Sequence, residues 1–252
     1  MLSSNLSCLI LIGGRGTRMG SLTKNNPKPL LKVGKFTILS HIFTQVRLLG
    51  LNKVIFCTGY LSKKIENYIY KNLVLDSNKI LKKLNKKKIL IPKFYISRSS
   101  TDATTSERII NAKKIIKKDS LMVIYGDTLL NINYKKFKNY LSKNTLADIL
   151  LKVSNPRERF GVVKILNNKV ISFLEKNYDR EKWVNSGWLF INNNTLLKIN
   201  NKKYNFEEYI MKNLKKLNIK IYKNKSYYLP IDNISDLQKA NFDWKRNKKI
   251  WF

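Results

Sequence analysis

An apolar run that leads directly into a glycine-rich basic loop is the feature that most constrains the fold of this chain. The run Cys8–Ile12 is typical of a buried first strand. Glycine allows backbone angles and close approaches that a Cβ would forbid, and the loop that follows contains Gly13, Gly14, Gly16 and Gly20. Successive free N–H groups in such a loop form a concavity that binds anions. A phosphate-binding loop after the first strand is therefore predicted.

The basic residues of this loop are also suited to phosphate. Arg15 and Arg18 offer fork-shaped donors, and Lys28 offers a point charge. Pro27 and Pro29 fix their own φ angles and restrict the residue before each, so Lys28 lies on a stiff segment. A purely structural turn would leave these basic residues unexplained, and we predict that the loop holds a polyphosphate.

The spacing excludes two common phosphate loops. The G-x-G-x-x-G dinucleotide fingerprint would need a glycine at position 19, which is Met19, and the Gly-Lys-Ser/Thr of a Walker A loop is absent. The pattern that is present is Gly-Gly-x-Gly-Thr-Arg, with Lys28 ten residues after Arg18.

The net charge of +34 suggests a nucleic-acid-binding protein, but its distribution argues against one. Lysine outnumbers arginine by 41 to 9, whereas forked contacts to bases and phosphates favour arginine. The chain also has 30 asparagines and 28 isoleucines against four alanines, as an AT-biased coding sequence would produce. We interpret most of the charge as compositional drift on a solvated surface.

A chain of 252 residues that is 43% hydrophobic can bury one large core. Cys8 and Cys57 lie in apolar runs and are expected to be reduced core residues. Neither a signal peptide nor a run of eighteen apolar residues is evident, so a soluble cytoplasmic protein is expected.

Strands and helices are predicted to alternate in the first half, which is typical of a doubly wound α/β sheet. The predicted strands are Cys8–Ile12, Lys53–Cys57, Lys93–Ile96 and Leu121–Tyr125, and the predicted helices are Ile38–Leu49, Leu61–Tyr70 and Thr104–Ile116. Gly50 supplies a stop for the first helix, while the lysine-rich segment Asn72–Pro92 supports no assignment.

The second half predicts mixed or antiparallel additions to the sheet, closed by two helices. The predicted strands are Ala147–Lys152, Val162–Ile165, Val170–Glu175 and Gly187–Ile191, with a turn at Asn167-Asn168, and the helices are Asn205–Leu217 and Ile234–Asn247. No linker separates the halves, so a single domain is expected.

Three further segments carry charged residues and are predicted to lie at the edge where open α/β sheets bind ligands. Tyr125–Asp127 and Phe173–Lys176 lie at the ends of predicted strands, and Leu229–Asp232 comes just before the last predicted helix. Taken alone, Asp127 could cap a turn, Asp232 could cap the last helix, and Glu175 and Lys176 could be a solvated strand end. Beside a phosphate loop, however, Mg²⁺ typically takes one or two carboxylates plus substrate phosphates, and Asp127 and Asp232 supply that number.

Other catalytic centres are disfavoured. His41 is the only histidine and lies within a predicted helix, so a packed or surface role is expected. One histidine and two separated cysteines make no zinc site of the usual type, and no serine has the surroundings of a Ser-His-Asp nucleophile.

From Cys8 to about Trp244 the sequence resembles the sugar-1-phosphate nucleotidyltransferase family, and within it most closely the cytidylyltransferases that act on glucose 1-phosphate. The segments that carry this resemblance are Gly13–Pro29, Ile38–Ile42, Cys57–Tyr60, Tyr125–Asp127, Arg159–Gly161, Phe173–Lys176, Asn185–Gly187 and Leu229–Asp232. The resemblance implies a Rossmann-like mixed sheet, with residues 1–130 as a nucleotide-binding half and 131–252 as a sugar-phosphate-binding half of one domain.

The resemblance also implies roles for individual residues. Arg18, Lys28 and Lys176 would be catalytic, with Lys28 on the triphosphate and Lys176 on the sugar phosphate, and Asp127 and Asp232 would bind Mg²⁺. The substrate-binding residues would be Gly13, Gly14, Gly16, Thr17, Thr105, Arg108, Gly126, Gly161, Glu175, Asn185 and Gly187.

The implied reaction is attack of a sugar 1-phosphate on the α-phosphorus of an NTP, expected to be CTP, with release of pyrophosphate. A homo-oligomer without a nucleic-acid or membrane partner is expected. One segment departs from the family, because Thr105-Ser106-Glu107-Arg108 stands where the cytidylyltransferases carry Thr-Gly-Gly-Arg. A relative that makes a GDP-, UDP- or dTDP-sugar therefore remains open, as does a nucleotide- or nucleic-acid-binding protein without turnover.

Overall fold

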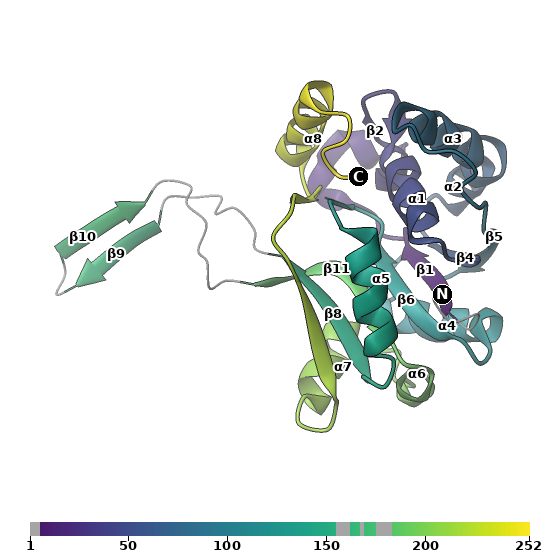
Figure 1. The fold of residues 1–252 in the computed structure, drawn as a ribbon, viewed down its shortest axis with the longest axis vertical. Helices are drawn as coiled ribbons and strands as arrows, with labels where there is room; N and C mark the ends of the chain where they lie inside the picture. Colours follow the sequence, from purple (N-terminus) through teal and green to yellow (C-terminus); the bar gives the residue numbers. More distant parts are fainter. Residues whose placement is uncertain (1–5, 155–161, 167–168, 175–182) are drawn as a thin grey trace.

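A seven-stranded mixed sheet flanked by helices forms the body of the computed structural model (Figure 1), which describes residues 6–154, 162–166, 169–174 and 183–252. The strand order is β12-β8-β11-β6-β1-β4-β5. Only β11 runs antiparallel to its neighbours, and the other six strands are parallel. The strands are β1 (Leu6–Leu11), β4 (Lys53–Thr58), β5 (Lys93–Arg98), β6 (Ser120–Tyr125), β8 (Ile149–Ser154), β11 (Val184–Ile191) and β12 (Ile219–Asn224).

Alternation along the central strands divides the core into two layers. Cys8 and Ile10 of β1 face a core cluster shared with helices α1, α3, α5 and α8, whereas Leu9 faces a second cluster shared with α4, α6 and α7. The helices are α1 (Ile38–Leu49), α2 (Ser62–Tyr68), α3 (Val74–Lys83), α4 (Thr105–Ile116), α5 (Tyr134–Lys143), α6 (Asn193–Lys198), α7 (Phe206–Asn213) and α8 (Ile234–Arg246). The predicted doubly wound mixed sheet is confirmed.

Several local predictions are also confirmed. Helix α1 has the predicted bounds, with the Thr37 hydroxyl capping its first turn and Gly50 ending it at a φ of 74°. Cys8 and Cys57 are buried and free, and burial raises the pKa of each thiol. Among the described residues, each helix falls short of the length or apolar character needed to cross a membrane.

The lysine-rich part of the chain holds more helix than expected. The predicted helix Leu61–Tyr70 does not stop at Tyr70, because α2 continues through a π-helical turn, η3 (Ile69–Leu73), into α3. Leu73, Ser77, Ile80 and Leu81 are buried at helical spacing. Lys79, Lys82 and Lys83 of the same helix are exposed to solvent. Helix α5 was missed for a related reason, since only Phe137 and Leu141 are buried among its lysines.

Strand pairing in the second half differs from the prediction in two places. β9 (Val162–Leu166) and β10 (Lys169–Leu174) pair with each other as a separate two-stranded sheet rather than extending the main sheet, and the predicted turn between them lies outside the described residues. The edge strand β12 was not predicted. It pairs in parallel with β8, and its partly exposed faces blur the alternation that marks a strand.

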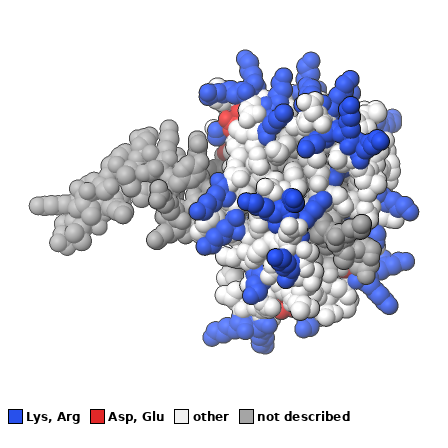
Figure 2. All heavy atoms as spheres, viewed as in Figure 1, with Lys and Arg blue, Asp and Glu red and all other residues white. Residues whose placement is uncertain are grey.

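Basic side chains are scattered over the described part of the face drawn in Figure 2, with uncharged residues between them. They come from many elements rather than from one helix or one groove, which agrees with the interpretation of the charge as a dispersed surface feature.

His41 is fully buried in an aromatic cluster at the amino-terminal end of α1, so of the two roles expected, packed or surface, it has the packed one. Its ring centroid lies 4.7 Å from that of Trp244 and 5.3 Å from that of Trp251. Trp251 Nε1 donates to His41 Nδ1 at 3.3 Å, and His41 Nε2 lies 3.0 Å from the carbonyl oxygen of Val33. Because an indole can only donate, Nδ1 accepts and Nε2 carries the single proton of a neutral ring.

This burial predicts a pH dependence of stability. Desolvation lowers the pKa of His41 from 6.5 to about 4. The unfolded chain therefore binds more protons than the folded one between these pH values, so stability is complete above 6.5 and falls as the pH drops toward 4. We expect a loss of about 2 kcal/mol of unfolding free energy from His41 between pH 7 and pH 5. Urea denaturation of the native protein and of His41→Gln at both pH values tests this, and equal losses in the two proteins would contradict it.

A phosphate pocket between two carboxylates and two cations

A pocket of about 220 Å³ opens beyond the carboxyl ends of β1 and β6, where the topology of the sheet predicts a ligand. Most of its lining comes from residues that the sequence singled out. The predicted residues in its wall are Gly14, Gly16, Thr17, Arg18, Lys28, Gly126, Asp127 and Asp232, and the others are Leu11, Ile12 and Pro29.

Glycine is required where the two strand ends meet the loop. Gly16 has a φ of 66° and precedes the 3₁₀ segment η1 (Thr17–Thr23), whose last residue donates its hydroxyl to the Gly16 carbonyl oxygen at 3.0 Å. At Gly126, a Cβ would lie 2.5 Å from the carbonyl oxygen of Leu11. This close approach keeps the tips of β1 and β6 side by side and forms one wall of the pocket.

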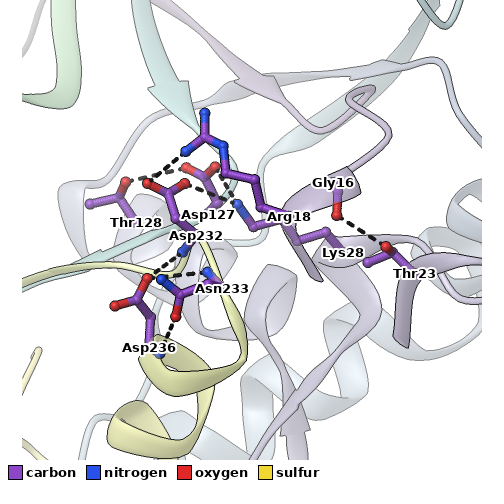
Figure 3. Close-up of polar contacts among 9 residues, drawn as sticks. All are labelled: Gly16, Arg18, Thr23, Lys28, Asp127, Thr128, Asp232, Asn233 and Asp236. Atoms are coloured by element: carbon purple, nitrogen blue, oxygen red, sulfur yellow. Dashed lines mark hydrogen bonds and ion pairs between the residues drawn. The ribbon is translucent and has the colours of Figure 1, made fainter. Parts of the chain in front are cut away.

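Lys28 joins the two predicted metal ligands (Figure 3). It opens the short 3₁₀ helix η2 (Lys28–Leu30) between the two prolines, and its side chain is only 12% exposed. Its Nζ donates to Asp127 Oδ2 at 2.8 Å and to Asp232 Oδ1 at 3.5 Å. The stiff segment predicted from the sequence thus aims the ammonium group between two carboxylates that are 105 positions apart in the chain.

Two short strands hold these carboxylates together. β7 (Thr128–Leu130) follows Asp127, and β13 (Tyr228–Pro230) precedes Asp232 by one residue. The strands pair antiparallel, with Pro230 opposite Thr128, and the Ile231 N–H donates to the Asp127 carbonyl oxygen at 2.8 Å. The backbone therefore fixes the distance between the two carboxylates, independently of any ligand.

Asp232 does not cap the last helix. Asn233 is the N-cap of α8 and forms a capping box with Asp236, whose carboxylate accepts from the N–H groups of both Asn233 and Asp232. The Asp232 carboxylate is therefore free to face the pocket, where Arg18 Nη1 lies 3.2 Å from its Oδ2 (Figure 3). The Arg18 side chain is 75% exposed, so this surface pair adds little to stability.

The charges of the pocket balance without a ligand, since Arg18 and Lys28 offset Asp127 and Asp232. Thr128, which the sequence did not single out, donates to Asp127 Oδ1 at 3.3 Å. Among the described residues, no group of three or more His, Cys, Asp or Glu side chains gathers as a metal cage. An oxygen-ligated cation at these two carboxylates would therefore take its other ligands from water or from a bound substrate.

Two predicted sugar-phosphate residues lie beside this pocket, at a bulge of β11. Gly187 has a φ of 75°, and a Cβ on it would lie 3.0 Å from the Cβ of Tyr125, which directly precedes Gly126. The Gly187 N–H donates to Asn185 Oδ1 at 3.0 Å, and the pairing of β11 with β8 is irregular from Asn185 to Trp188. The bulge thus packs against the strand tip that carries Asp127.

A buried lysine behind this bulge was missed by the sequence analysis. Lys152 of β8 is fully buried, and its Nζ donates to the hydroxyl of Ser186 at 3.4 Å. Desolvation lowers the pKa of Lys152 to about 7. A lysine within an apolar strand could have indicated a buried charge. Its position behind the bulge could not be predicted, because that position depends on the pairing of β8 with β11.

Other predicted residues do not line the pocket. Thr105 lies in the first turn of α4, where its hydroxyl accepts from the N–H of Phe206 at 2.8 Å. Arg108 is buried behind the loop and is turned toward main-chain carbonyls. Gly161, Glu175 and Lys176 lie outside the described residues.

The segment that departs from the family pattern forms the first turn of α4. Thr104 is the N-cap and accepts from the Glu107 N–H at 3.1 Å, so Ser106 and Glu107 occupy helical positions. The Ser106 side chain is buried, and Glu107 is half-buried. The two residues that replace glycines thus continue a Thr-x-x-Glu sequence that favours the start of a helix.

Comparison with known proteins shows the family to which the chain is similar. A family model described as nucleotidyl transferase matches residues 7–245. The chain is 28% identical to the "probable glucose-1-phosphate cytidylyltransferase" of Bacillus subtilis over 98% of this chain and 99% of that protein. It is 29% identical to the D-glycero-alpha-D-manno-heptose 1-phosphate guanylyltransferase of Campylobacter jejuni over 90% of this chain and 94% of that one.

A solved structure of UDP-glucose pyrophosphorylase complexed with UDP-glucose has a similar fold, with a TM-score of 0.70 over 95% of this chain and 98% of that one. Its sequence identity to this chain is 15%.

Proposed function

Because the chain belongs to the nucleotidyl transferase family, we propose that it transfers the cytidylyl group of CTP to glucose 1-phosphate. Sugar-1-phosphate nucleotidyl transfer is supported by the family match and by the names of its relatives, and an NTP and a sugar 1-phosphate are its substrates. The observation that carries the proposed site is the contact of Lys28 with both Asp127 and Asp232 in the wall of a glycine-lined pocket.

Two observations support the choice of substrates. The Bacillus subtilis relative, which matches this chain almost from end to end, is named for glucose 1-phosphate and cytidylyl transfer. The motifs that resemble the cytidylyltransferases include the Asn185–Gly187 bulge beside the pocket. A second candidate is guanylyl transfer to a heptose 1-phosphate, because the Campylobacter jejuni relative is equally similar in sequence.

The proposed reaction is an in-line displacement. An oxygen of the sugar 1-phosphate forms a bond to the α-phosphorus of the NTP, the bond to the bridging oxygen breaks, and its electron pair leaves with pyrophosphate. The nucleophile is already an anion, so the chain need not remove a proton. Lys28 and Arg18 would exchange carboxylate contacts for phosphate contacts and would offset the charge that gathers on the leaving group.

We include Mg²⁺ in this proposal, with Asp127 and Asp232 as its protein ligands. The donor set fits, because Mg²⁺ is usually held by one or two carboxylates and completes its shell with waters and substrate phosphates. Bound there, Mg²⁺ would neutralise phosphate oxygens. The short β7–β13 pair would keep the two carboxylates oriented, and the Thr128 hydroxyl would hold one oxygen of Asp127.

A substrate panel tests the proposed function. CTP, GTP, UTP and dTTP are each combined with glucose 1-phosphate and with a heptose 1-phosphate, and pyrophosphate release is measured in Mg²⁺. We expect the highest kcat/KM for CTP with glucose 1-phosphate, and no sustained release when the sugar phosphate is omitted. A higher kcat/KM for GTP with the heptose 1-phosphate would replace the first candidate with the second, and a preference for UTP or dTTP would contradict both.

Substitution of Asp127 tests the metal site. Asp127→Asn removes one preorganised charge, and we expect kcat/KM to fall on the order of 10²–10³-fold. Chelation by EDTA should abolish turnover in the native enzyme. Full activity in EDTA, or in a folded Asp127→Asn variant, would contradict the metal assignment.

Asp119→Asn is the matched control for this substitution. Asp119 Oδ2 also lies 2.8 Å from a lysine Nζ, that of Lys53, but it precedes the first residue of β6, at the opposite end of that strand from Asp127. Its loss should lower stability while kcat/KM stays near the native value.

A further inference from the structure

The guanidinium group of Arg108 is turned entirely toward the main chain. The residue is 5% exposed and lies in α4, behind the phosphate loop. Its Nη2 donates to the carbonyl oxygens of Gly13 at 3.3 Å, Ser100 at 3.3 Å and Thr101 at 3.0 Å. Its Nε donates to Ala103 O at 3.2 Å, and its Nη1 donates to Thr58 O at 3.5 Å.

These five carbonyls replace the counter-ion that a buried charge usually requires. Within the described part of the chain, the ion pairs of the protein do not include Arg108. Arginine suits this task because its planar group presents five N–H donors in a fixed fork. Each of its three nitrogens is directed at a carbonyl, and at 5% exposure the group leaves a ligand little access.

Two glycines make room for this group. A Cβ on Gly13 would lie 1.8 Å from Arg108 Nη1, which no side chain could tolerate. A Cβ on Gly59 would lie 2.9 Å from the same atom and 2.6 Å from the Gly13 carbonyl oxygen. A side chain at either position would collide with the Arg108 guanidinium group. The packing of Arg108 is therefore a reason for glycine at these positions, in addition to the approach of the loop to a ligand.

The five contacts join three separate segments. They are the first turn of the phosphate loop at Gly13, the end of β4 at Thr58, and the loop 100–103 that leads into α4. The ion pair of Arg15 with Asp102, at 3.1 Å on the surface, joins the first and third segments a second time. Gly13 directly precedes Gly14, which lines the pocket. The contacts of Arg108 with these three segments therefore reach the edge of the pocket.

We propose that Arg108 is a positioning residue, which fixes the Gly13–Gly14 turn so that the backbone of the loop is preorganised for the triphosphate, without touching the nucleotide itself. This inference rests on the proposed function for the identity of the ligand. The family resemblance implied that Arg108 contacts the substrate directly. In this proposal Arg108 instead affects substrate binding indirectly, by holding the loop in place.

The substitution Arg108→Lys keeps the positive charge but removes the planar arrangement of five N–H donors. An ammonium group keeps the positive charge but has three donors at one point, so at least two of the five carbonyls lose their partner. The loop would then be less well placed for the triphosphate, and a displacement of about 1 Å can cost on the order of 10²-fold in activity. The sugar-phosphate side, at the bulge of β11, should be unaffected.

Arg47→Lys is the matched control. Arg47 is also buried, and its Nε and Nη2 donate to the carbonyl oxygens of Leu90 and Ile89 at 3.1 and 3.0 Å; none of these three residues lines the pocket. The same substitution there also removes a fork from backbone carbonyls. It should lower the melting temperature without changing either KM.

The test measures melting temperature, kcat and both KM values for the native enzyme, Arg108→Lys, Arg108→Gln and Arg47→Lys, with the NTP that the native enzyme prefers. We expect KM for the NTP to rise on the order of 10–10²-fold in both Arg108 variants, while KM for the sugar 1-phosphate stays within about twofold. If Arg108→Lys behaves like Arg47→Lys, the residue is only structural and the inference is wrong. If the native enzyme turns over no NTP, the proposed function is wrong instead.

A measurement on the native chain keeps the inference testable if the Arg108 variants do not fold. The chain has nine arginines, and among the described ones Arg47 is the other buried arginine, so Arg47→Lys identifies its signal in a ¹⁵N spectrum of arginine side chains. We expect slow proton exchange at Arg108 Nε both without and with saturating NTP. Rapid exchange in the free enzyme, or protection that arises only with NTP, would show that the group contacts the nucleotide and would overturn the proposal.

Discussion

The ammonium group of Lys28 is the point at which the two halves of the chain meet in the pocket. It lies 2.8 Å from Asp127 Oδ2, which follows a central strand, and 3.5 Å from Asp232 Oδ1, which precedes the last helix. Without Lys28 and Arg18, the two carboxylates would face each other uncompensated, and like charges at such a distance repel. The chain itself therefore supplies the cations that compensate the two carboxylates, and a bound substrate would redirect them.

The surrounding scaffold holds this cluster through the backbone rather than through the charges themselves. The β7–β13 pair fixes the positions of the two carboxylates, and the prolines on either side of Lys28 fix the position of its ammonium group. Arg108, in α4, holds the first turn of the loop and the end of β4 by hydrogen bonds. Preorganisation of this kind suits phosphoryl chemistry, in which positioning and charge stabilisation provide most of the acceleration. Function in this account depends on small segments around the sheet as much as on the sheet.

Sequence alone was enough to predict six of the seven strands of the main sheet and most of the pocket wall. Glycines, prolines and strand-end carboxylates mark the backbone requirements of the pocket directly. The sequence suggested Asp232 as a possible cap of α8, whereas the cap is Asn233; Asp236, three residues after Asn233, was an available capping-box signal. It could not predict the role of Arg108, because that role depends on carbonyls up to 95 positions away. Helix α5 was not predicted, because lysines separate the few buried apolar residues that mark its inner face.

The central claim is that nucleotidyl transfer takes place at the Lys28–Asp127–Asp232 cluster. The most direct test follows label from α-³²P- and γ-³²P-labelled NTP in the native enzyme, in Lys28→Met and in the control Lys24→Met, whose lysine is exposed. We expect α-label in the sugar nucleotide and γ-label only in pyrophosphate, at a rate lower by on the order of 10²-fold in Lys28→Met alone. Transfer of γ-label to the sugar, or a native rate in Lys28→Met, would contradict the account.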